Sequence, residues 1–193
     1  MDGEPEIAQS RNERSCDFDG ELIIHVGPHK TGTTTIQRYL SENKDKLERA
    51  GILYPDAGRG WGVNAPEQHW HFGRAIVEGD NSYLARFVEE LEVEYRSAGV
   101  RKILLSTEVL SRNNAKPNKL ETITRLFPNA TRRWIVVLRR TDDLMKSLYS
   151  EQLKKGLIRF PTDWRSSRLY ATSNIAFAFT ASGTATSGSW PMA

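Results

Sequence analysis

Three short apolar runs most constrain the fold of this chain. They cover residues 21–26 (ELIIHV), 101–106 (RKILLS) and 133–138 (RWIVVL). Each run is continuously apolar rather than alternating with polar residues, which is typical of strands buried on both faces of a parallel sheet. Each also contains β-branched residues, which favour strands. We therefore expect three buried parallel strands.

Helical patterns fill the sequence between these runs. Apolar residues recur with the period of a helix over residues 36–47, 84–95 and 141–156, with Asn43 interrupting the first stretch. Gly51 and Gly99 stand where C-terminal caps of the first two helices belong. Strands that alternate with helices predict an α/β fold: a three-layer, P-loop-like parallel sheet flanked by helices, incomplete at the C-terminus.

Composition predicts one soluble globular domain between two segments of different character. The chain has 193 residues, of which 38% are hydrophobic and 26% charged. We expect a disordered lead-in over residues 1–20, a domain over 21–168 and a low-complexity tail over 169–193, which contains no charged side chain. The tail has two interpretations: a flexible extension, or a change of reading frame or exon structure.

Charge and cysteine content exclude several classes of protein. Cys16 is the only cysteine, which excludes an internal disulfide framework, and we expect it to be a spectator thiol in the lead-in. A net charge of +3 suits an anionic ligand but is too small to indicate a nucleic-acid partner.

The sequence shows neither an apolar run long enough to span a membrane nor a signal peptide, which predicts a cytoplasmic location. The oligomeric state stays open.

The loop after the first apolar run has the glycine spacing of a phosphate-binding loop. Gly27 and Gly32 are spaced as in the Walker A motif, but Thr33 follows the second glycine where that motif has lysine. The only lysine of the loop, Lys30, lies inside it. A loop that opens a helix presents free backbone N–H groups and the positive end of the helix dipole, so it favours anions. The alternative interpretation is a turn rich in glycine and threonine that merely caps the helix.

Residues 28–34, Pro-His-Lys-Thr-Gly-Thr-Thr, resemble a known donor-binding loop. This is the 5′-phosphosulfate-binding loop of the sulfotransferases that use 3′-phosphoadenosine 5′-phosphosulfate (PAPS), in their bacterial-type branch. The resemblance implies that Lys30 stabilises the bridging oxygen of the donor as it leaves, without a metal ion. It also implies donor contacts from His29, Lys30, Thr31, Gly32, Thr33 and Thr34. His29 departs from the proline that many members have beside the lysine.

A second motif follows the third apolar run. Arg139, Asp143, Ser147 and Tyr149 match the spacing R-x-x-x-D-x-x-x-S-x-Y, which resembles the 3′-phosphate site of the same family. The resemblance implies that Arg139 and Ser147 bind the 3′-phosphate of PAPS. An arginine at the end of a strand can bind phosphate through two parallel hydrogen bonds, which independently suits this role. The alternative is that the arginines of this stretch pair with its aspartates on the surface.

The transfer also needs a base that takes the proton from the acceptor. Glu108 is the first candidate, because it follows the second strand at the sheet edge where Lys30 is expected; it could also be an ordinary exposed glutamate. His69 and His71 are rivals, with a half-buried aromatic segment or an incomplete metal pair as alternatives. His29 is more readily a structural or sulfate-contacting residue. No metal-ligand spacing stands out.

The resemblance covers roughly residues 21–160 and predicts a sulfotransferase that moves a sulfuryl group from PAPS to an acceptor hydroxyl or amine. Carbohydrate is the acceptor that the bacterial-type loop favours; lipids and small alcohols also fit. Two alternatives remain open. One is a non-catalytic, truncated nucleotide-binding paralogue, because residues 169–193 lack the family's basic, glycine-containing loop. The other is a P-loop nucleotide kinase or NTPase, which would need magnesium.

Overall fold

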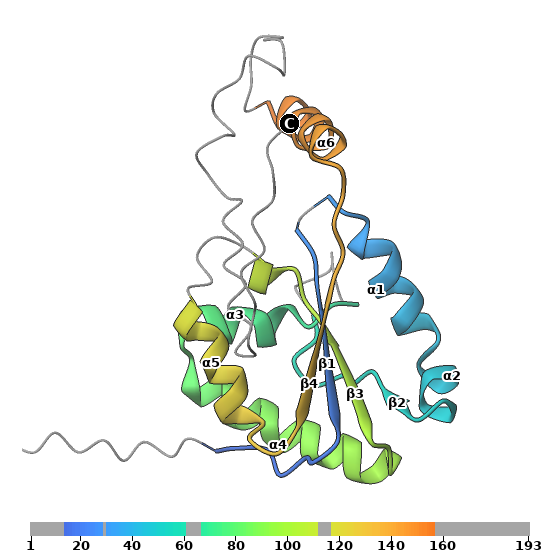
Figure 1. The fold of residues 1–193 in the computed structure, drawn as a ribbon, viewed down its shortest axis with the longest axis vertical. Coiled ribbons are helices and arrows are strands. Elements are labelled where there is room, and N and C mark those ends of the chain that lie inside the picture. The colour runs from blue at the N-terminus through green and yellow to red at the C-terminus, as the bar shows by residue number, and fades with distance from the viewer. Residues whose placement is uncertain (1–13, 29, 61–66, 112–116, 157–193) are drawn as a thin grey trace, which may run out of the picture.

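A four-stranded parallel sheet forms the centre of the molecule (Figure 1). The computed structural model describes residues 14–28, 30–60, 67–111 and 117–156. The strands are β1 (Glu21–Val26), β2 (Ile52–Leu53), β3 (Lys102–Ser106) and β4 (Thr131–Val136), in the order β2-β3-β1-β4. The predicted α/β fold with a parallel sheet is confirmed.

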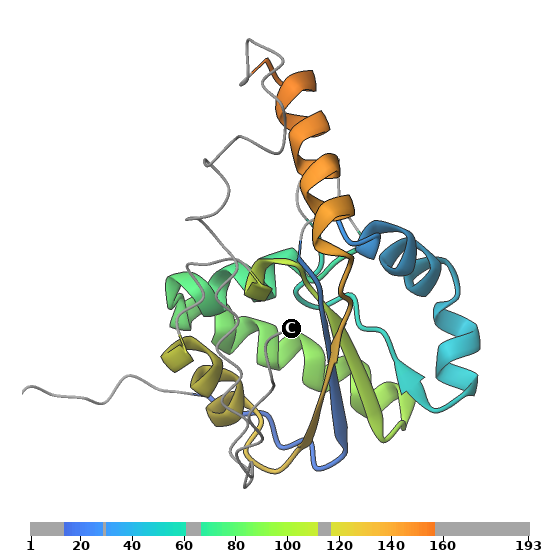
Figure 2. The same cartoon turned by 45° about the horizontal axis from the view of Figure 1, so that its top comes forward.

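Helices cover both faces of this sheet. They are α1 (Thr33–Glu42), α2 (Lys44–Arg49), α3 (Trp70–Glu78), α4 (Asn81–Ala98), the short 3₁₀ helix η1 (Val109–Ser111), α5 (Pro117–Leu126) and α6 (Thr141–Lys154). In Figure 1, α1 and α2 lie on one side of the strands and α3, α4 and α5 on the other. Helix α6 extends beyond the carboxyl ends of the strands (Figure 2).

The side chains of β1 alternate between the two helical layers. Leu22 and Ile24 belong to the larger core, which α3, α4 and α5 complete. Ile23 belongs to a smaller cluster, against which Leu40 of α1 and Leu47 of α2 pack. Because both faces of β1 are covered, its sequence is continuously apolar, as predicted.

Strand β4 differs from this expectation. The strand begins two residues before the predicted run, and most of it is exposed. Trp134 and Ile135 keep 37% and 42% of their surface in solvent. The reason is position: β4 pairs with β1 and with no other strand in the described parts of the chain. The prediction of a buried strand is therefore wrong for residues 133–138.

The segment just before β1 is folded onto the domain. Cys16 and Phe18 are buried in the larger core, and the Cys16 N–H donates a hydrogen bond to the Leu126 carbonyl at 2.7 Å. Burial raises the pKa of the Cys16 thiol to about 11. The expectation of a disordered lead-in is thus wrong for residues 14–20, and Cys16 is a core residue rather than a spectator. Residues 1–13 and the expected tail, 169–193, lie outside the described residues.

The helix predicted over residues 36–47 is two helices, α1 and α2. The chain breaks at Asn43, whose side-chain amide donates to the Tyr39 carbonyl at 2.8 Å. Asparagine often ends helices in this way, because its side chain competes for backbone groups. Helix α4 ends at Gly99 in the left-handed conformation, as predicted. Within the described residues, no helix has the length and apolar character that crossing a bilayer requires.

Candidate functional site

The connections of β1 and β3 leave the sheet on opposite faces. The chain passes from β1 to α1 on one face, and from β3 through η1 to α5 on the other (Figure 1). Open α/β sheets form their ligand-binding crevices at such points, beyond the carboxyl ends of the strands. The loop after β1, Glu108 after β3 and Arg139 after β4 all lie at this edge. We therefore take this edge as the candidate site.

The loop between β1 and α1 folds tightly over Gly27. A Cβ atom at this position would lie 2.5 Å from Cγ2 of Thr33 and 3.0 Å from Oγ1 of Thr31, which leaves no room for a side chain. Gly32 caps the start of α1 with a φ of 89°, a conformation that favours glycine. Lys30 also has a positive φ, 73°, which costs a non-glycine residue about 1–2 kcal/mol.

Two of the threonine hydroxyls of the loop bind within the protein. Thr31 Oγ1 donates to the Pro28 carbonyl at 2.8 Å, and the buried Thr33 hydroxyl donates to the Glu108 carboxylate. Thr34 is exposed. The first turn of α1 adds backbone N–H groups that a helix does not satisfy internally, together with the positive end of its dipole. The loop can therefore bind an anion chiefly through backbone groups and Lys30.

Glu108 lies at the junction of the loop with α1. It is only 8% exposed, so the alternative of an ordinary exposed glutamate does not hold. Its carboxylate accepts the Thr33 hydroxyl. Ser111 Oγ lies 2.8 Å from the Gly27 carbonyl oxygen and 2.7 Å from that of Glu108. The contact with Gly27 connects η1 to the loop. The carboxylate and the loop thus form one connected unit.

Arg139 and Lys30 bring the two sequence motifs into contact. Nη1 of Arg139 donates to the Lys30 carbonyl at 3.0 Å, although the two residues are far apart in the sequence. The Lys30 ammonium lies 3.1 Å from the Glu151 carboxylate of α6. Arg140, in contrast, pairs with Asp142 at 2.8 Å, as the surface-pairing alternative proposed. The β1 loop and the β4–α6 junction are therefore neighbours in space.

The position of Ser147 follows from the helix that carries it. Residues four apart in a helix lie on the same face, so half-buried Ser147 stands one turn before Glu151 on the side of α6 that reaches Lys30. Tyr149 is also half-buried in α6. His29 lies outside the described residues.

His69 is a structural residue. It is fully buried, its Nδ1 accepts the Ser106 backbone N–H at 3.0 Å, and its Nε2 then donates to the Pro55 carbonyl at 3.0 Å. Burial, reinforced by the charge of Arg59, lowers its pKa to about 3. A neutral ring with both nitrogens bound to backbone groups is not available as a base.

His71 belongs to an aromatic cluster. It lies half-buried in the first turn of α3, with its ring centroid 5.3 Å from that of Trp70 and 6.0 Å from that of Tyr83. Its ring contacts are with side chains of α3 and α4, whereas the Glu108 carboxylate accepts the hydroxyl of Thr33 in the loop. The structure brings Glu108, and not His71, to the loop.

Sequence reasoning missed His25 and Glu151. His25 is buried, and its Nδ1 lies 2.7 Å from Oγ of Ser106, its neighbour across β1 and β3. Burial lowers its pKa, and the charge of Glu108 opposes this effect. Alternation along the strand predicts that His25 faces α1. A spacing of four residues predicts that Glu151 lies on the same face of its helix as Ser147. Both signals were present in the sequence.

Two other features lie away from this edge. Cys16, Asp17 and Glu92 bring ligand atoms within 4.8 Å of one another, but Arg96 pairs with Asp17 at 2.7 Å and the thiol is protonated at neutral pH. This arrangement is an ion-pair cluster.

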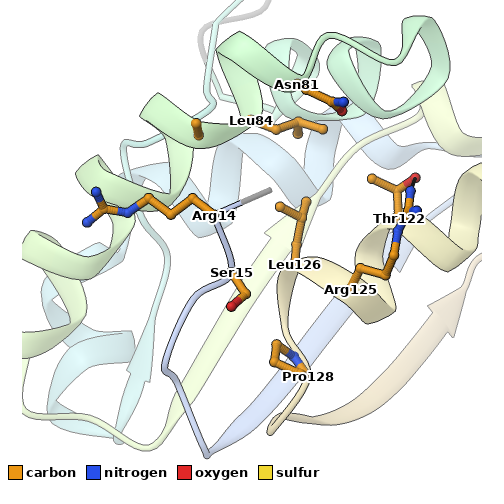
Figure 3. Close-up of a pocket in the computed structure, with 9 residues that line it drawn as sticks. Arg14, Ser15, Asn81, Leu84, Thr122, Arg125, Leu126 and Pro128 are labelled. Carbon is orange, nitrogen blue, oxygen red and sulfur yellow. Dashed lines mark hydrogen bonds between the residues drawn. The ribbon is translucent and has the colours of Figure 1, made fainter. Parts of the chain in front are cut away.

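A cavity of about 310 Å³ lies between α4, α5 and the segment before β1 (Figure 3). It is lined by Arg14, Ser15, Asn81, Leu84, Ala85, Thr122, Arg125, Leu126 and Pro128, none of which is a predicted site residue.

Comparisons with known proteins add no family to this geometry. No family model, curated protein or solved structure matches the chain.

Proposed function

We propose that the chain is a sulfotransferase that moves a sulfuryl group from PAPS to an acceptor hydroxyl or amine. The observation that carries the proposal is the contact between Arg139 and Lys30, at 3.0 Å. It joins a loop suited to a 5′-phosphosulfate with an arginine suited to a second phosphate, and PAPS carries both groups. A site with two separate anion positions favours this donor over inorganic phosphate or sulfate.

Each residue of the site has a chemical role in this proposal. Thr31, Gly32, Thr33 and Thr34 cradle the 5′-phosphosulfate with the backbone N–H groups of the α1 first turn. Lys30 neutralises the bridging oxygen as its bond to sulfur breaks. Arg139 and Ser147 bind the 3′-phosphate.

Glu108 is the base in this proposal. Its carboxylate takes the proton of the acceptor hydroxyl while the acceptor oxygen forms its bond to sulfur. The sulfur–oxygen bond to the 5′-phosphate breaks at the same time, and its electron pair stays on the phosphate oxygen beside Lys30. The products are the sulfated acceptor, adenosine 3′,5′-bisphosphate and protonated Glu108. The hydrogen bond from Thr33 fixes this carboxylate beside the loop. Carbohydrate is the acceptor class that we propose.

A non-catalytic nucleotide-binding paralogue is the second candidate. The pairing of Lys30 with Glu151 favours it, because the cation of the loop is already neutralised. A P-loop NTPase fits less well. Thr33 occupies the position of the Walker lysine, and neither β3, which ends at Ser106, nor β4, which ends at Val136, supplies an aspartate at its last residue.

Calorimetric titration with adenosine 3′,5′-bisphosphate in the absence of magnesium tests the proposal. We expect saturable binding that weakens in Lys30→Ala and in Arg139→Ala, because each variant removes one charge from one of the two anion positions. Lys44→Ala and Arg74→Ala are matched controls: both residues carry exposed ion pairs, with Asp56 and Glu78, away from the site. These controls should bind as the wild type does.

Turnover and metal dependence separate the candidates. Sulfate transfer from PAPS to a panel of sugars, abolished in Lys30→Ala, identifies the enzyme, whereas binding without transfer identifies the paralogue. Binding that requires magnesium would identify an NTPase. If the folded wild type does not bind adenosine 3′,5′-bisphosphate, the sulfotransferase proposal is wrong.

A further inference from the structure

Lys30 is held at both ends by the segment that contains β4 and α6. Its backbone carbonyl accepts from Arg139, and its ammonium lies 3.1 Å from Glu151. The residue has a positive φ of 73°, a conformation that only surrounding contacts can stabilise in a lysine. The position of this cation therefore depends on α6 as well as on its own loop.

Glu151 forms ion pairs with two lysines. Its side chain is 17% exposed, and its carboxylate lies 3.1 Å from Lys30 and 2.7 Å from Lys155, which follows α6. Lys155 stands four residues after Glu151, so their pairing lies along the helix axis. The Lys30 pair, in contrast, crosses from one segment of the fold to another.

We propose that Glu151 is an internal competitor for Lys30, so that a donor anion must displace it to enter the loop. This inference rests on the proposed function, because it assigns the regulation of the same anion position. In the free protein, Glu151 neutralises the cation that the phosphosulfate needs. When the donor binds, Lys30 transfers from the carboxylate to the donor.

The charges of the three groups make this exchange feasible. The phosphosulfate carries a negative charge on both its phosphate and its sulfate, so it attracts Lys30 more strongly than one carboxylate does. Two anions cannot share one ammonium in this space without repulsion. Lys155 remains beside Glu151 after the exchange and keeps the carboxylate from being left unpaired at the edge of the site.

Glu151→Gln tests the competition directly, because it keeps the shape of the side chain and removes its charge. Partly exposed ion pairs of this kind correspond to about a two- to fivefold change in an equilibrium constant. We expect adenosine 3′,5′-bisphosphate to bind Glu151→Gln about two- to fivefold more tightly than the wild type, with the difference shrinking as salt rises. Isothermal titration at two salt concentrations measures both effects.

Glu78→Gln is the matched control, since Glu78 also pairs with a cation four residues away but lies on α3. It changes the net charge by the same amount and should leave affinity unchanged. If it tightens binding as much as Glu151→Gln does, general electrostatics explain the effect and the proposal is wrong.

Lys155→Ala gives a second, opposite readout. Without Lys155, Glu151 depends more on Lys30, so donor binding should weaken. In the double variant with Glu151→Gln this weakening should disappear, because the carboxylate that Lys155 neutralises is gone. An equal effect of Lys155→Ala in both backgrounds would show that Lys155 acts on the ligand directly, against the proposal.

Inorganic pyrophosphate, titrated in parallel, separates this inference from the proposed function. Equal affinities of wild type and Glu151→Gln for adenosine 3′,5′-bisphosphate overturn the competition and leave the function standing. Tighter pyrophosphate binding by Glu151→Gln, with no binding of the bisphosphate by either, supports the competition and overturns the function. If neither probe binds either protein, both are wrong.

Discussion

At the scale of single residues, Gly27 and Gly32 are glycines for different reasons. A side chain at Gly27 would meet Thr33 at 2.5 Å, whereas Gly32 has nothing within 4 Å and only its positive φ favours glycine. We expect Gly27→Ala to cost about 1–3 kcal/mol of stability through overpacking. Gly32→Ala should cost about 1 kcal/mol through backbone strain. Urea unfolding measures both.

The two glycine variants should also differ in ligand binding. Gly27→Ala displaces the threonines of the loop, so it should abolish binding of adenosine 3′,5′-bisphosphate at concentrations where Gly32→Ala retains some. A Gly32→Ala variant that is both less stable and weaker in binding than Gly27→Ala would contradict this account.

His69 makes stability depend on pH. Its pKa is about 3 in the folded protein and 6.5 in the unfolded chain, so below pH 6.5 the unfolded chain binds the extra proton. The stability that the folded protein has with a neutral, buried His69 is therefore fully present above pH 6.5. It is lost progressively as the pH falls from 6.5 towards 3. We expect the free energy of unfolding, from urea titrations, to fall by about 1 kcal/mol between pH 7.5 and 5.5.

His25 adds to the same trend, because burial also lowers its pKa. His69→Gln, which keeps hydrogen-bonding groups but does not titrate, should flatten the dependence between pH 7.5 and 5.5, even if it lowers stability overall. An unchanged slope in this variant would assign the pH effect to other groups.

At the scale of elements, β1 and β4 have similar apolar sequences and different environments. Ile24 in β1 is fully buried, while Ile135 in β4 is 42% exposed. Ile24→Ala should cost about 2–5 kcal/mol, as truncations in a core do. Ile135→Ala should cost well under half of that, because part of the side chain is already in water. Thermal and urea unfolding of the two variants compare these costs; equal losses would mean that β4 is covered in solution.

This contrast also explains how much of the fold could be predicted. The buried strands β1 and β3, the helix cap at Gly99 and the α/β class follow from local patterns, and the structure matches them. Whether a strand lies at an edge depends on which distant segments cover it, so the exposure of β4 was not predictable from its own residues. The break at Asn43 was visible as an interruption but not as a helix end.

The candidate site divides in the same way. The loop after β1 and the arginine after β4 could be placed at one edge, because parallel strands end together. The hydrogen bond from Thr33 to Glu108 and the pair of Lys30 with Glu151 could not, because each joins segments whose side-chain packing is set by tertiary structure.

At the scale of the whole molecule, the candidate site joins segments that follow three of the four strands. A ligand that contacts the β1 loop and Arg139 together should stabilise the fold as a unit. At a hundredfold excess over its dissociation constant, adenosine 3′,5′-bisphosphate should raise the free energy of unfolding by about 2.7 kcal/mol. Thermal shift assays of wild type and Arg139→Ala measure this, and an equal rise in the two would place the ligand elsewhere.

Strand β4 has one further consequence. Its outer edge is unpaired among the described strands, and Trp134, Ile135 and Leu138 are exposed along the same segment. Such an edge is a template for strand addition by another chain. We therefore expect a preparation that is fully folded when dilute to self-associate as its concentration rises, which light scattering over a concentration series measures.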